Sequence, residues 1–257
     1  MLEPLTPSTV LERRGDVVWF RFNRPERRNA YDEEMIDALA QALRDSHDAT
    51  AVVLTGVGNA FCAGGFLGAL AEPDETSLRR LFAASLRAFD EIRGHPRPVI
   101  AAVNGAAAGG GNELVIACDF AIAADSATFG QTGPRIGSAP VLGATNLLSV
   151  QVGEKRAKEM AFLCRRYTAA QALEWGLVNA VVPYDKLEAA VDGWLDEIRA
   201  LSPRYLEIAK VSSNVWWNVC RESAVTGLGM LIQTIGSEDM LEGARAFVEK
   251  RPPNFRG

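Results

Sequence analysis

Histidines and closely spaced cysteines are scarce in this sequence of 257 residues. Only two histidines occur, His47 and His95, and the four cysteines stand far apart at positions 62, 118, 164 and 220. Structural zinc sites take their Cys and His ligands mostly from closely spaced pairs. We therefore expect no metal site, and we expect the cysteines to be reduced thiols, mostly in the core.

An excess of positive charge is also lacking. Lys and Arg together number 27 and Asp and Glu 32, so the net charge is −5. Nucleic-acid-binding proteins carry a basic surface, so we expect no nucleic-acid partner. No apolar run reaches the roughly 20 residues of a membrane-spanning helix, so we expect no membrane partner either. Residues 1–9 contain Glu3 and two prolines rather than the apolar segment of a signal peptide, which predicts a cytoplasmic protein.

Apolar residues are plentiful, at 48% of the chain, and they follow two patterns. In the first half, short apolar runs typical of buried strands alternate with segments of helical periodicity. The last third is mostly helical in pattern, with Ser237 as a helix cap. We predict an α/β fold with a core domain over residues 1–195 and a helical C-terminal region over residues 196–257. Strands are expected at 17–23, 51–55, 99–103 and 120–123, and helices at 32–45, 76–92, 113–118, 186–201, 205–219 and 238–250.

Two segments share one arrangement, in which a buried strand leads into a glycine-rich turn. The first leads to Gly64-Gly65 and the second to Gly109-Gly110-Gly111. Glycine lets the backbone approach a ligand closely, and the N–H groups in the first turn of a helix lack internal partners. Two such turns side by side predict a site that holds a developing oxyanion between backbone N–H groups.

Glu113 is unusual because it is the only charged residue between Arg97 and Asp119. The apolar run 114–117 follows it, so its helix is expected to be buried. A buried carboxylate is costly unless it is paired or protonated. Two interpretations stay open: a general acid or base whose pKa is tuned by its apolar setting, or an acid that interacts with the dipole at the start of a helix.

Several segments, taken in chain order, resemble the signature motifs of the enoyl-CoA hydratase/isomerase (crotonase) superfamily. They are Asn23-Arg-Pro-Glu-Arg-Arg-Asn-Ala30, Phe61-Cys-Ala-Gly-Gly65, residues 104–114 with Cys118-Asp119, Phe129-Gly-Gln131, Trp175-Gly-Leu-Val-Asn179 and Phe247-Val-Glu-Lys-Arg251. The resemblance implies a crotonase-like spiral of ββα units with a C-terminal helical trimerisation region. It also implies a homotrimer, or a hexamer built as a dimer of trimers. The implied substrate is an acyl-CoA thioester, and no separate cofactor is expected because coenzyme A is part of that substrate.

The same resemblance implies roles for particular residues. The N–H groups of Gly65 and Gly110 would hold the thioester oxyanion. Glu113 corresponds to the first of the two catalytic glutamates of the hydratases. Arg28 corresponds to a region that contacts CoA, and Lys250 to a lysine that approaches CoA phosphates, in many members from a neighbouring subunit. For Arg28 and Lys250 the alternative is a solvated surface charge.

The sequence departs from the hydratase pattern around the acyl group. Gly133 stands where hydratases carry their second catalytic glutamate, and Phe66 stands where an Asp usually follows the first glycine pair. We expect substrate-binding or water-positioning contacts from Ala63, Phe66, Gln131, Thr132, Gly133 and Ser138. The alternative for Gln131 and Thr132 is that they only build a turn. The alternative for Phe66 is a place in the core. We expect Trp175 and Trp216 in the core, with a place in the substrate wall as the alternative. We expect Cys62 to be a core thiol, with a nucleophile as the alternative.

Residues 129–138 and Cys164-Arg-Arg-Tyr167 resemble a branch of the superfamily that closes or cleaves rings. The branch includes 1,4-dihydroxy-2-naphthoyl-CoA synthase and 2-ketocyclohexanecarboxyl-CoA hydrolase. Those enzymes carry an Asp where this chain has Pro140, and they usually lack the glutamate that is kept here as Glu113. Gly137-Ser-Ala-Pro140 with Gly143-Ala-Thr145 is more similar to 6-oxocyclohex-1-ene-1-carbonyl-CoA hydrolase.

We therefore predict an enoyl-CoA hydratase-like lyase that adds water to an enoyl-CoA, linear or cyclic, through an oxyanion-stabilised thioester enolate. One alternative is a hydrolase that opens the ring of a cyclic keto acyl-CoA by C–C cleavage, and another is a non-catalytic acyl-CoA-binding scaffold. A dinucleotide-binding protein is disfavoured because neither glycine turn has the GxGxxG spacing.

Overall fold

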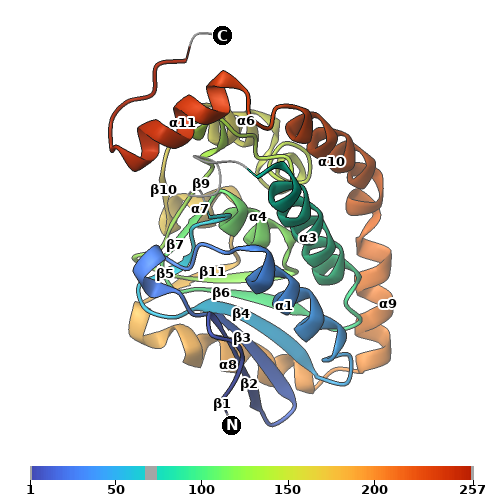
Figure 1. The fold of residues 1–257 in the computed structure, drawn as a ribbon. Coiled ribbons are helices and arrows are strands. Elements are labelled where there is room, and N and C mark those ends of the chain that lie inside the picture. Colours follow the sequence, from blue (N-terminus) through green and yellow to red (C-terminus); the bar gives the residue numbers. More distant parts are fainter. Residues whose placement is uncertain (1, 67–73, 256–257) are drawn as a thin grey trace.

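Two β-sheets and the helices around them make up the fold (Figure 1). The computed structural model describes residues 2–66 and 74–255. The larger sheet consists, in spatial order, of β1 (Leu2–Thr6), β2 (Thr9–Arg14), β3 (Val17–Phe22), β4 (Ala51–Gly56), β6 (Val99–Val103), β8 (Phe120–Ala124) and β11 (Ala180–Val182). The smaller sheet consists of β10 (Tyr167–Thr168), β9 (Thr128–Gly130), β7 (Ala106–Ala108) and β5 (Ala60–Cys62).

Successive parts of the chain contribute one strand to each sheet and then a helix. β4 is followed by β5 and then α3 (Glu75–Gly94), β6 by β7 and α4 (Gly110–Ala117), and β8 by β9 and the 3-10 helix η2 (Gly133–Ile136). The neighbours within each series, β4, β6, β8 and β5, β7, β9, pair in parallel. This is the α/β spiral of ββα units predicted from the sequence. Because β5 and β7 are parallel neighbours, the glycine turns that follow them meet at one end of the smaller sheet.

The two faces of the larger sheet are covered by different helices because alternate side chains of a strand point to opposite sides. Leu54 belongs to the core shared with α1 (Glu33–Arg44), α3 and α4, whereas Val53 belongs to the core beneath α8 (Leu187–Arg199), where it joins Val191. α8 accordingly lies on the other side of this sheet from α1 and α3 (Figure 1). These two apolar layers hold the strand ends, and so the turns, in fixed positions.

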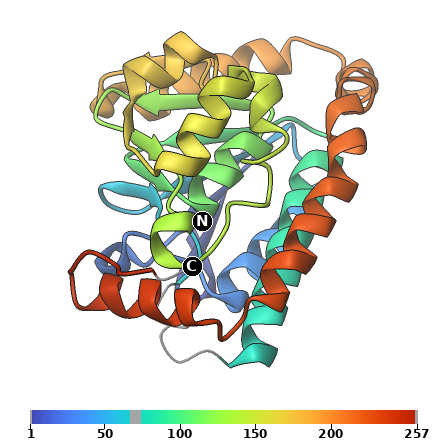
Figure 2. The same cartoon turned by 90° about the horizontal axis from the view of Figure 1, so that it is seen from above.

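The last part of the chain is helical, but one predicted helix is wrong. The helix expected over 205–219 is two helices, α9 (Pro203–Ser213) and α10 (Val215–Gln233). The break falls at Asn214, whose side-chain amide donates to the carbonyl of Arg93 at 2.6 Å and so ties the chain to the end of α3. α10 then runs beside α3 (Figure 2). The remaining helices are η1 (Pro25–Arg27), α5 (Leu148–Val152), α6 (Glu154–Leu163), α7 (Ala169–Trp175), η3 (Tyr184–Lys186) and α11 (Glu238–Val248).

Most of the other expected elements are present, with small differences. The side chain of Ser237 caps α11 as predicted, since it accepts the N–H of Met240. The helix expected at 113–118 already begins at Gly110, so Glu113 lies in its first turn. Trp216 is 53% exposed in the single chain, so its expected place in the core is wrong. Trp175, by contrast, packs against the core and against the ring of Tyr167.

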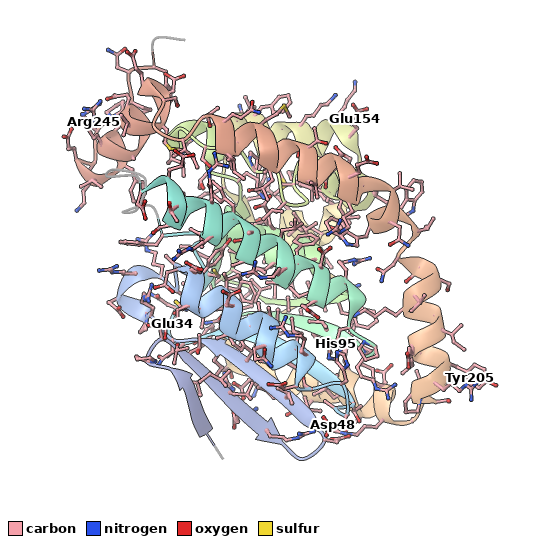
Figure 3. All side chains as sticks on the ribbon, turned by 45° about the vertical axis from the view of Figure 1, so that its right-hand side comes forward. Glu34, Asp48, His95, Glu154, Tyr205 and Arg245 are labelled. Atoms are coloured by element: carbon pink, nitrogen blue, oxygen red, sulfur yellow. The ribbon has the colours of Figure 1, made fainter. Side chains whose placement is uncertain are left out.

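The cysteines are free thiols, and three of the four are buried, as expected. None of the helices in the described part of the chain combines the length and the apolarity needed to cross a membrane. Charged side chains such as Glu34, Asp48, Glu154 and Arg245 lie on the outside of the molecule (Figure 3).

Candidate active site

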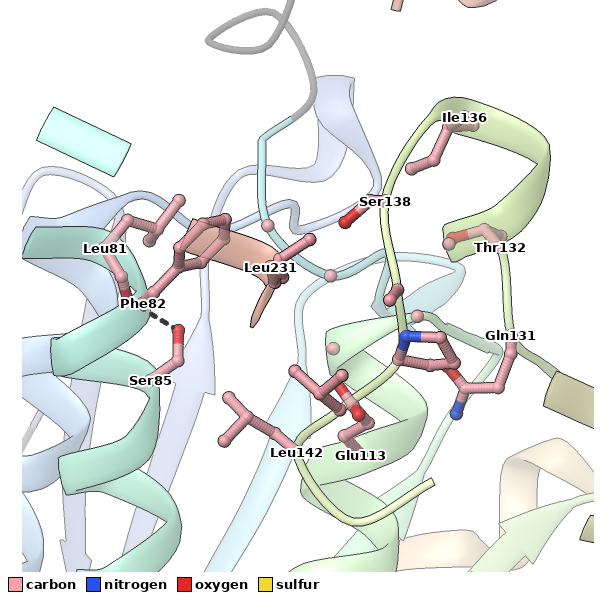
Figure 4. A pocket seen from close by; sticks show the side chains of 18 of the residues that line it. Leu81, Phe82, Ser85, Glu113, Gln131, Thr132, Ile136, Ser138, Leu142 and Leu231 are labelled. Carbon is pink, nitrogen blue, oxygen red and sulfur yellow. Dashed lines mark hydrogen bonds between the residues drawn. The ribbon is translucent and has the colours of Figure 1, made fainter. Parts of the chain in front are cut away.

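A pocket opens between the two glycine turns, α3, α10 and the segment after η2 (Figure 4). The open space in and in front of it is about 740 Å³. Leu81 and Phe82 of α3, Leu231 of α10 and Leu142 form an apolar wall. Among the described residues that line the pocket, Glu113 carries the only carboxyl group.

The first glycine turn is shaped by pairing with Tyr31. The N–H of Tyr31 donates to the carbonyl of Gly64 at 2.9 Å, and the N–H of Phe66 donates to the carbonyl of Tyr31 at 2.8 Å. Successive peptide groups of an extended chain face opposite sides. The N–H of Gly65 therefore points away from the backbone of Tyr31 and takes no part in this pairing. Gly65 lines the pocket, where its N–H can meet a ligand.

The second glycine turn leads into α4. Gly109 has a φ of 52°, a left-handed conformation that favours glycine, and its N–H donates to the carbonyl of Gly130 at 2.9 Å. Gly110 is the first residue of α4, so its N–H has no acceptor within the helix. A Cβ atom placed on Gly64 would lie 2.8 Å from the nitrogen of Gly110, so the two turns are in direct contact. Gly65 and Gly110 thus line the same pocket.

Two glycines of the second turn are required by close packing. A Cβ atom on Gly110 would collide with the hydroxyl of Tyr31, and one on Gly111 would collide with the backbone carbonyl of Cys62. No L side chain fits at either position without displacing these groups. The Cβ position of Gly65, in contrast, meets only ordinary contacts, with Leu81 Cδ2 at 3.7 Å and Tyr31 Cε2 at 3.9 Å.

The carboxyl group of Glu113 points from α4 toward the pocket (Figure 4). The residue is only 8% exposed, and its Oε1 has no hydrogen-bond partner among the described residues. Burial raises the pKa of Glu113 well above the usual 4.5, and the nearby backbone N–H groups of Ala144 and Leu142 oppose this rise only in part. A raised pKa makes the carboxylate a stronger base, which is the direction that a general acid or base near neutral pH needs.

Gly133 lies at the start of η2, on the wall that the segment after η2 completes. A Cβ atom at this position would lie 3.0 Å from the backbone of Ala139 and 3.0 Å from Pro140 Cδ. These contacts are tighter than nearly all real Cβ contacts. A glutamate at position 133 therefore does not fit unless the 139–140 segment moves.

Polar side chains from the same segment also line the pocket: Gln131, Thr132 and Ser138. Gln131 is 1% exposed, and neither end of its amide has a partner among the described residues. The backbone of Thr132 helps to build the turn, because its carbonyl accepts the N–H of Arg135 at 3.1 Å. Figure 4 shows the hydroxyl of Ser138 on the pocket side of its loop. A buried amide without partners is costly, so Gln131 is available to a polar ligand.

The remaining predicted residues lie around this pocket in different ways. Phe66 and Ala63 line it, and the guanidinium of Arg27 lies 4.4 Å above the ring of Phe66. The N–H of Ala63 donates to the carbonyl of Arg28 at 3.0 Å, so Arg28 supports the first glycine turn through its backbone. The side chain of Arg28 is exposed and is not part of the pocket wall.

Lys250 lies outside the pocket and is exposed. It lines a second, wider hollow together with Phe162, Phe247 and Arg166. Ile136 lines both hollows, so they adjoin each other.

Two polar residues of the pocket were missed from the sequence. Tyr31 directly follows the Asn23 to Ala30 motif, and Ser85 lies on the buried face of α3, where the periodicity suggested only core. Their hydroxyl oxygens are 3.5 Å apart. The position of Tyr31 beside a motif was the available signal, but its pairing with Gly65 across the fold was not visible in the sequence.

Comparisons with known proteins agree with this fold. The profile of the family described as enoyl-CoA hydratase/isomerase matches residues 12–257. An enoyl-CoA hydratase from Bacillus anthracis is 33% identical, with 97% of this chain and 99% of that chain covered and a TM-score of 0.78. A carnitinyl-CoA hydratase from Mycobacterium avium is 31% identical, with 98% and 99% covered and a TM-score of 0.86. The chain therefore belongs to the enoyl-CoA hydratase/isomerase family.

Proposed function

We propose that the protein is an enoyl-CoA hydratase-like lyase, which adds water across the C=C bond of an enoyl-CoA. The observation that carries this proposal is the presence of one carboxyl group, Glu113, in the same pocket as Gly65 and Gly110. The thioester oxygen accepts hydrogen bonds from the two glycine N–H groups, which stabilise the charge that develops on it. The names of the two similar structures described above, both hydratases, support the same reaction class.

The reaction needs one proton to be taken up and one to be delivered. Ionised Glu113 takes a proton from a water molecule whose oxygen attacks Cβ of the enoyl group. The electron pair of the C=C bond moves to the thioester oxygen and forms an enolate. When the enolate collapses, the protonated Glu113 returns that proton to Cα. The raised pKa of Glu113 favours this single-residue exchange, because it makes the carboxylate a stronger base.

This chain has Gly133 where hydratases carry their second glutamate, so uncharged groups position the water. Gln131 and Ser138 fit this role, and Thr132 completes the polar side of the pocket. Gln131 is the strongest of these because its amide is buried and unpartnered. The acyl chain lies against the apolar wall formed by α3 and α10. No cofactor is needed, since coenzyme A enters as part of the substrate.

Binding of coenzyme A is assigned to groups at the mouth of the pocket. Ala63 and Phe66 contact the thioester end, and Arg28 contributes its positive charge. Lys250 binds CoA phosphates from the neighbouring hollow, either within the chain or on an adjacent subunit. Replacing Lys250 by Ala should raise KM and leave kcat nearly unchanged, which steady-state kinetics will measure.

Assembly into trimers, or into hexamers of two trimers, is proposed from the apolar surface of α9 and α10. Tyr205, Ile208 and Val211 of α9 are 71%, 54% and 64% exposed, and Trp216 and Val219 of α10 are 53% and 67% exposed. Figure 3 shows Tyr205 projecting away from the rest of the chain. A row of exposed apolar side chains at helical spacing is typical of an interface. Sedimentation equilibrium of the wild type and of a Trp216→Ser, Val219→Ser double variant tests this: the variant should dissociate.

A second candidate reaction is the hydrolytic opening of a cyclic keto acyl-CoA. The absence of a carboxyl group at Gly133 and the presence of Ser138 favour it. Water then attacks a ring ketone, the adjacent C–C bond breaks with its electron pair stabilised as the thioester enolate, and Cα takes up a proton.

Turnover of a panel of CoA thioesters tests the two reactions. Straight-chain enoyl-CoA, cyclic enoyl-CoA and cyclic β-keto acyl-CoA are each incubated with the protein, and the products are identified by mass spectrometry. Both reactions add the mass of one water, so the products are also assayed for a new free carboxylate. A hydroxyacyl-CoA supports the lyase, and a dicarboxylate mono-thioester supports the hydrolase. Binding without turnover of any member contradicts both and supports a non-catalytic acyl-CoA-binding scaffold.

A further inference from the structure

The ring of Tyr31 lies between the two glycines whose N–H groups face the thioester oxygen in the proposed function. Its Cε2 atom lies 3.9 Å from the Cβ position of Gly65. Its Cε1 atom lies 3.2 Å from the Cβ position of Gly110, and its hydroxyl occupies the space where that Cβ would be. Because Cε1 and Cε2 flank the hydroxyl carbon on opposite sides, the hydroxyl end of the ring is the part inserted between the two glycines.

Among the described residues, the hydroxyl of Tyr31 has only a distant acceptor. Its nearest polar partner is the Ser85 hydroxyl at 3.5 Å, the outer limit for a hydrogen bond. The Ser85 hydroxyl donates to the carbonyl of Leu81 at 2.8 Å, so its oxygen can accept from Tyr31, but only over this long distance. The Tyr31 residue is only 5% exposed, so water does not readily replace the missing partner, yet it lines the pocket. A buried donor in this situation is costly unless a ligand accepts its hydrogen bond.

We propose that the Tyr31 hydroxyl is a third hydrogen-bond donor to the thioester oxygen, beside the N–H groups of Gly65 and Gly110. This inference rests on the proposed function, because it needs an acyl-CoA in the pocket. The proposal also explains why residue 110 is a glycine: a side chain there would occupy the space of the Tyr31 hydroxyl.

Two further features agree with a donor at this place. Burial raises the pKa of Tyr31 above its usual 10, and the charge of Glu113 adds to that rise, so the phenol keeps its proton throughout the working range of pH. A hydrogen bond to the thioester oxygen strengthens as negative charge develops there, so the donor acts mainly in the transition state. It supplies electrostatic stabilisation in a site where Glu113 carries the only carboxyl group among the described lining residues.

Infrared difference spectroscopy of bound butanoyl-CoA, isotope-labelled at its carbonyl carbon, tests the inference directly. Hydrogen bonds to a carbonyl oxygen lower its stretching frequency. The wild-type protein should shift the band to lower frequency, and Tyr31→Phe should return part of that shift. Tyr167→Phe is the matched control. Tyr167 lies in β10 and is also buried, and its hydroxyl donates to Glu159 at 3.2 Å, so the change removes another tyrosine hydroxyl away from the two glycines. It should leave the band where the wild type has it.

Kinetics with the substrate that the panel identifies supply a second measurement. Tyr31→Phe should lower kcat by about tenfold or more with little change in KM, since removal of one oxyanion donor costs on the order of 10² to 10³ in a well-studied protease. A wild-type band shift that persists in Tyr31→Phe overturns the inference and leaves the proposed function standing. Failure of the wild type to bind any acyl-CoA overturns the proposed function and this inference together.

Discussion

Replacing Glu113 by Gln should change the stability of the protein and its catalytic activity in opposite directions. The amide keeps the shape of the carboxyl group but does not titrate. The folded-state pKa of Glu113 is raised by burial, so in the wild type the unfolded chain loses this proton at a lower pH than the folded chain. The stabilisation from the protonated carboxyl is therefore complete below the unfolded pKa and is lost as the pH rises toward the folded pKa.

The magnitude follows from the number of protons involved. One proton held by the folded chain and not by the unfolded chain lowers the free energy of unfolding by about 1.4 kcal/mol for each pH unit. This slope begins near the usual pKa of 4.5 and ends at the raised folded pKa. Glu113→Gln lacks this contribution, so its stability relative to the wild type should improve steadily over that interval.

Activity should change in the opposite direction. General acid–base catalysis by one positioned group contributes about 10² to 10⁴ in rate, which corresponds to roughly 3 to 5 kcal/mol of barrier. No other carboxyl group among the described residues lines the pocket, so none of these residues offers a substitute for Glu113. We expect kcat to fall by at least two orders of magnitude while the affinity for CoA remains.

Denaturant unfolding at a series of pH values and steady-state turnover of the identified substrate measure both effects. Glu154→Gln is the matched control, because this glutamate is on the surface, where it pairs with Lys158. It should leave turnover unchanged and change the unfolding free energy little, since exposed ion pairs contribute little to stability. Wild-type turnover in Glu113→Gln would refute its catalytic role. An unchanged pH slope of stability in that variant would refute the assignment of the raised pKa.

Three further predictions concern the same pocket. The kcat/KM of the wild type should rise with pH along an acidic limb whose apparent pKa lies above the usual 4.5, because the ionised Glu113 takes the proton from water; a pH–rate profile that is flat there contradicts this. Gly110→Ala should lose turnover because the new methyl group collides with the Tyr31 hydroxyl. Gly65→Ala should keep most of its turnover because the new methyl group meets only contacts of 3.7 and 3.9 Å; equal losses of turnover in the two variants would contradict this reasoning. Gly133→Ala should destabilise the fold by about 1 to 3 kcal/mol, the usual range for overpacking, because its Cβ would lie 3.0 Å from Ala139 and Pro140; denaturant unfolding without a change would show that this segment adapts freely.

Four strands of the larger sheet, β3, β4, β6 and β8, and most of the longer helices were readable from the sequence because each depends on local periodicity. The short strands of the smaller sheet were not predicted. Apolar runs marked β4 and β6, and the stripe of apolar residues marked α3. The break between α9 and α10 was not readable, because Asn214 stops the helix through a hydrogen bond to Arg93, 121 positions earlier in the chain. Trp216 was misplaced because helical periodicity does not distinguish a core face from an exposed apolar face.

By itself, the sequence determined which groups are available for chemistry. The glycine turns and the isolated charge of Glu113 are visible in it because backbone freedom and the cost of burying a carboxylate are properties of the residue and its neighbours. Only the tertiary structure decided what these groups meet: that the two turns touch, that a Cβ on Gly133 would lie tightly against Ala139 and Pro140, and that Lys250 lies in a separate hollow. It also placed Tyr31 between Gly65 and Gly110. Such contacts join residues far apart in the chain, so they depend on how the strands stack and not on any local pattern.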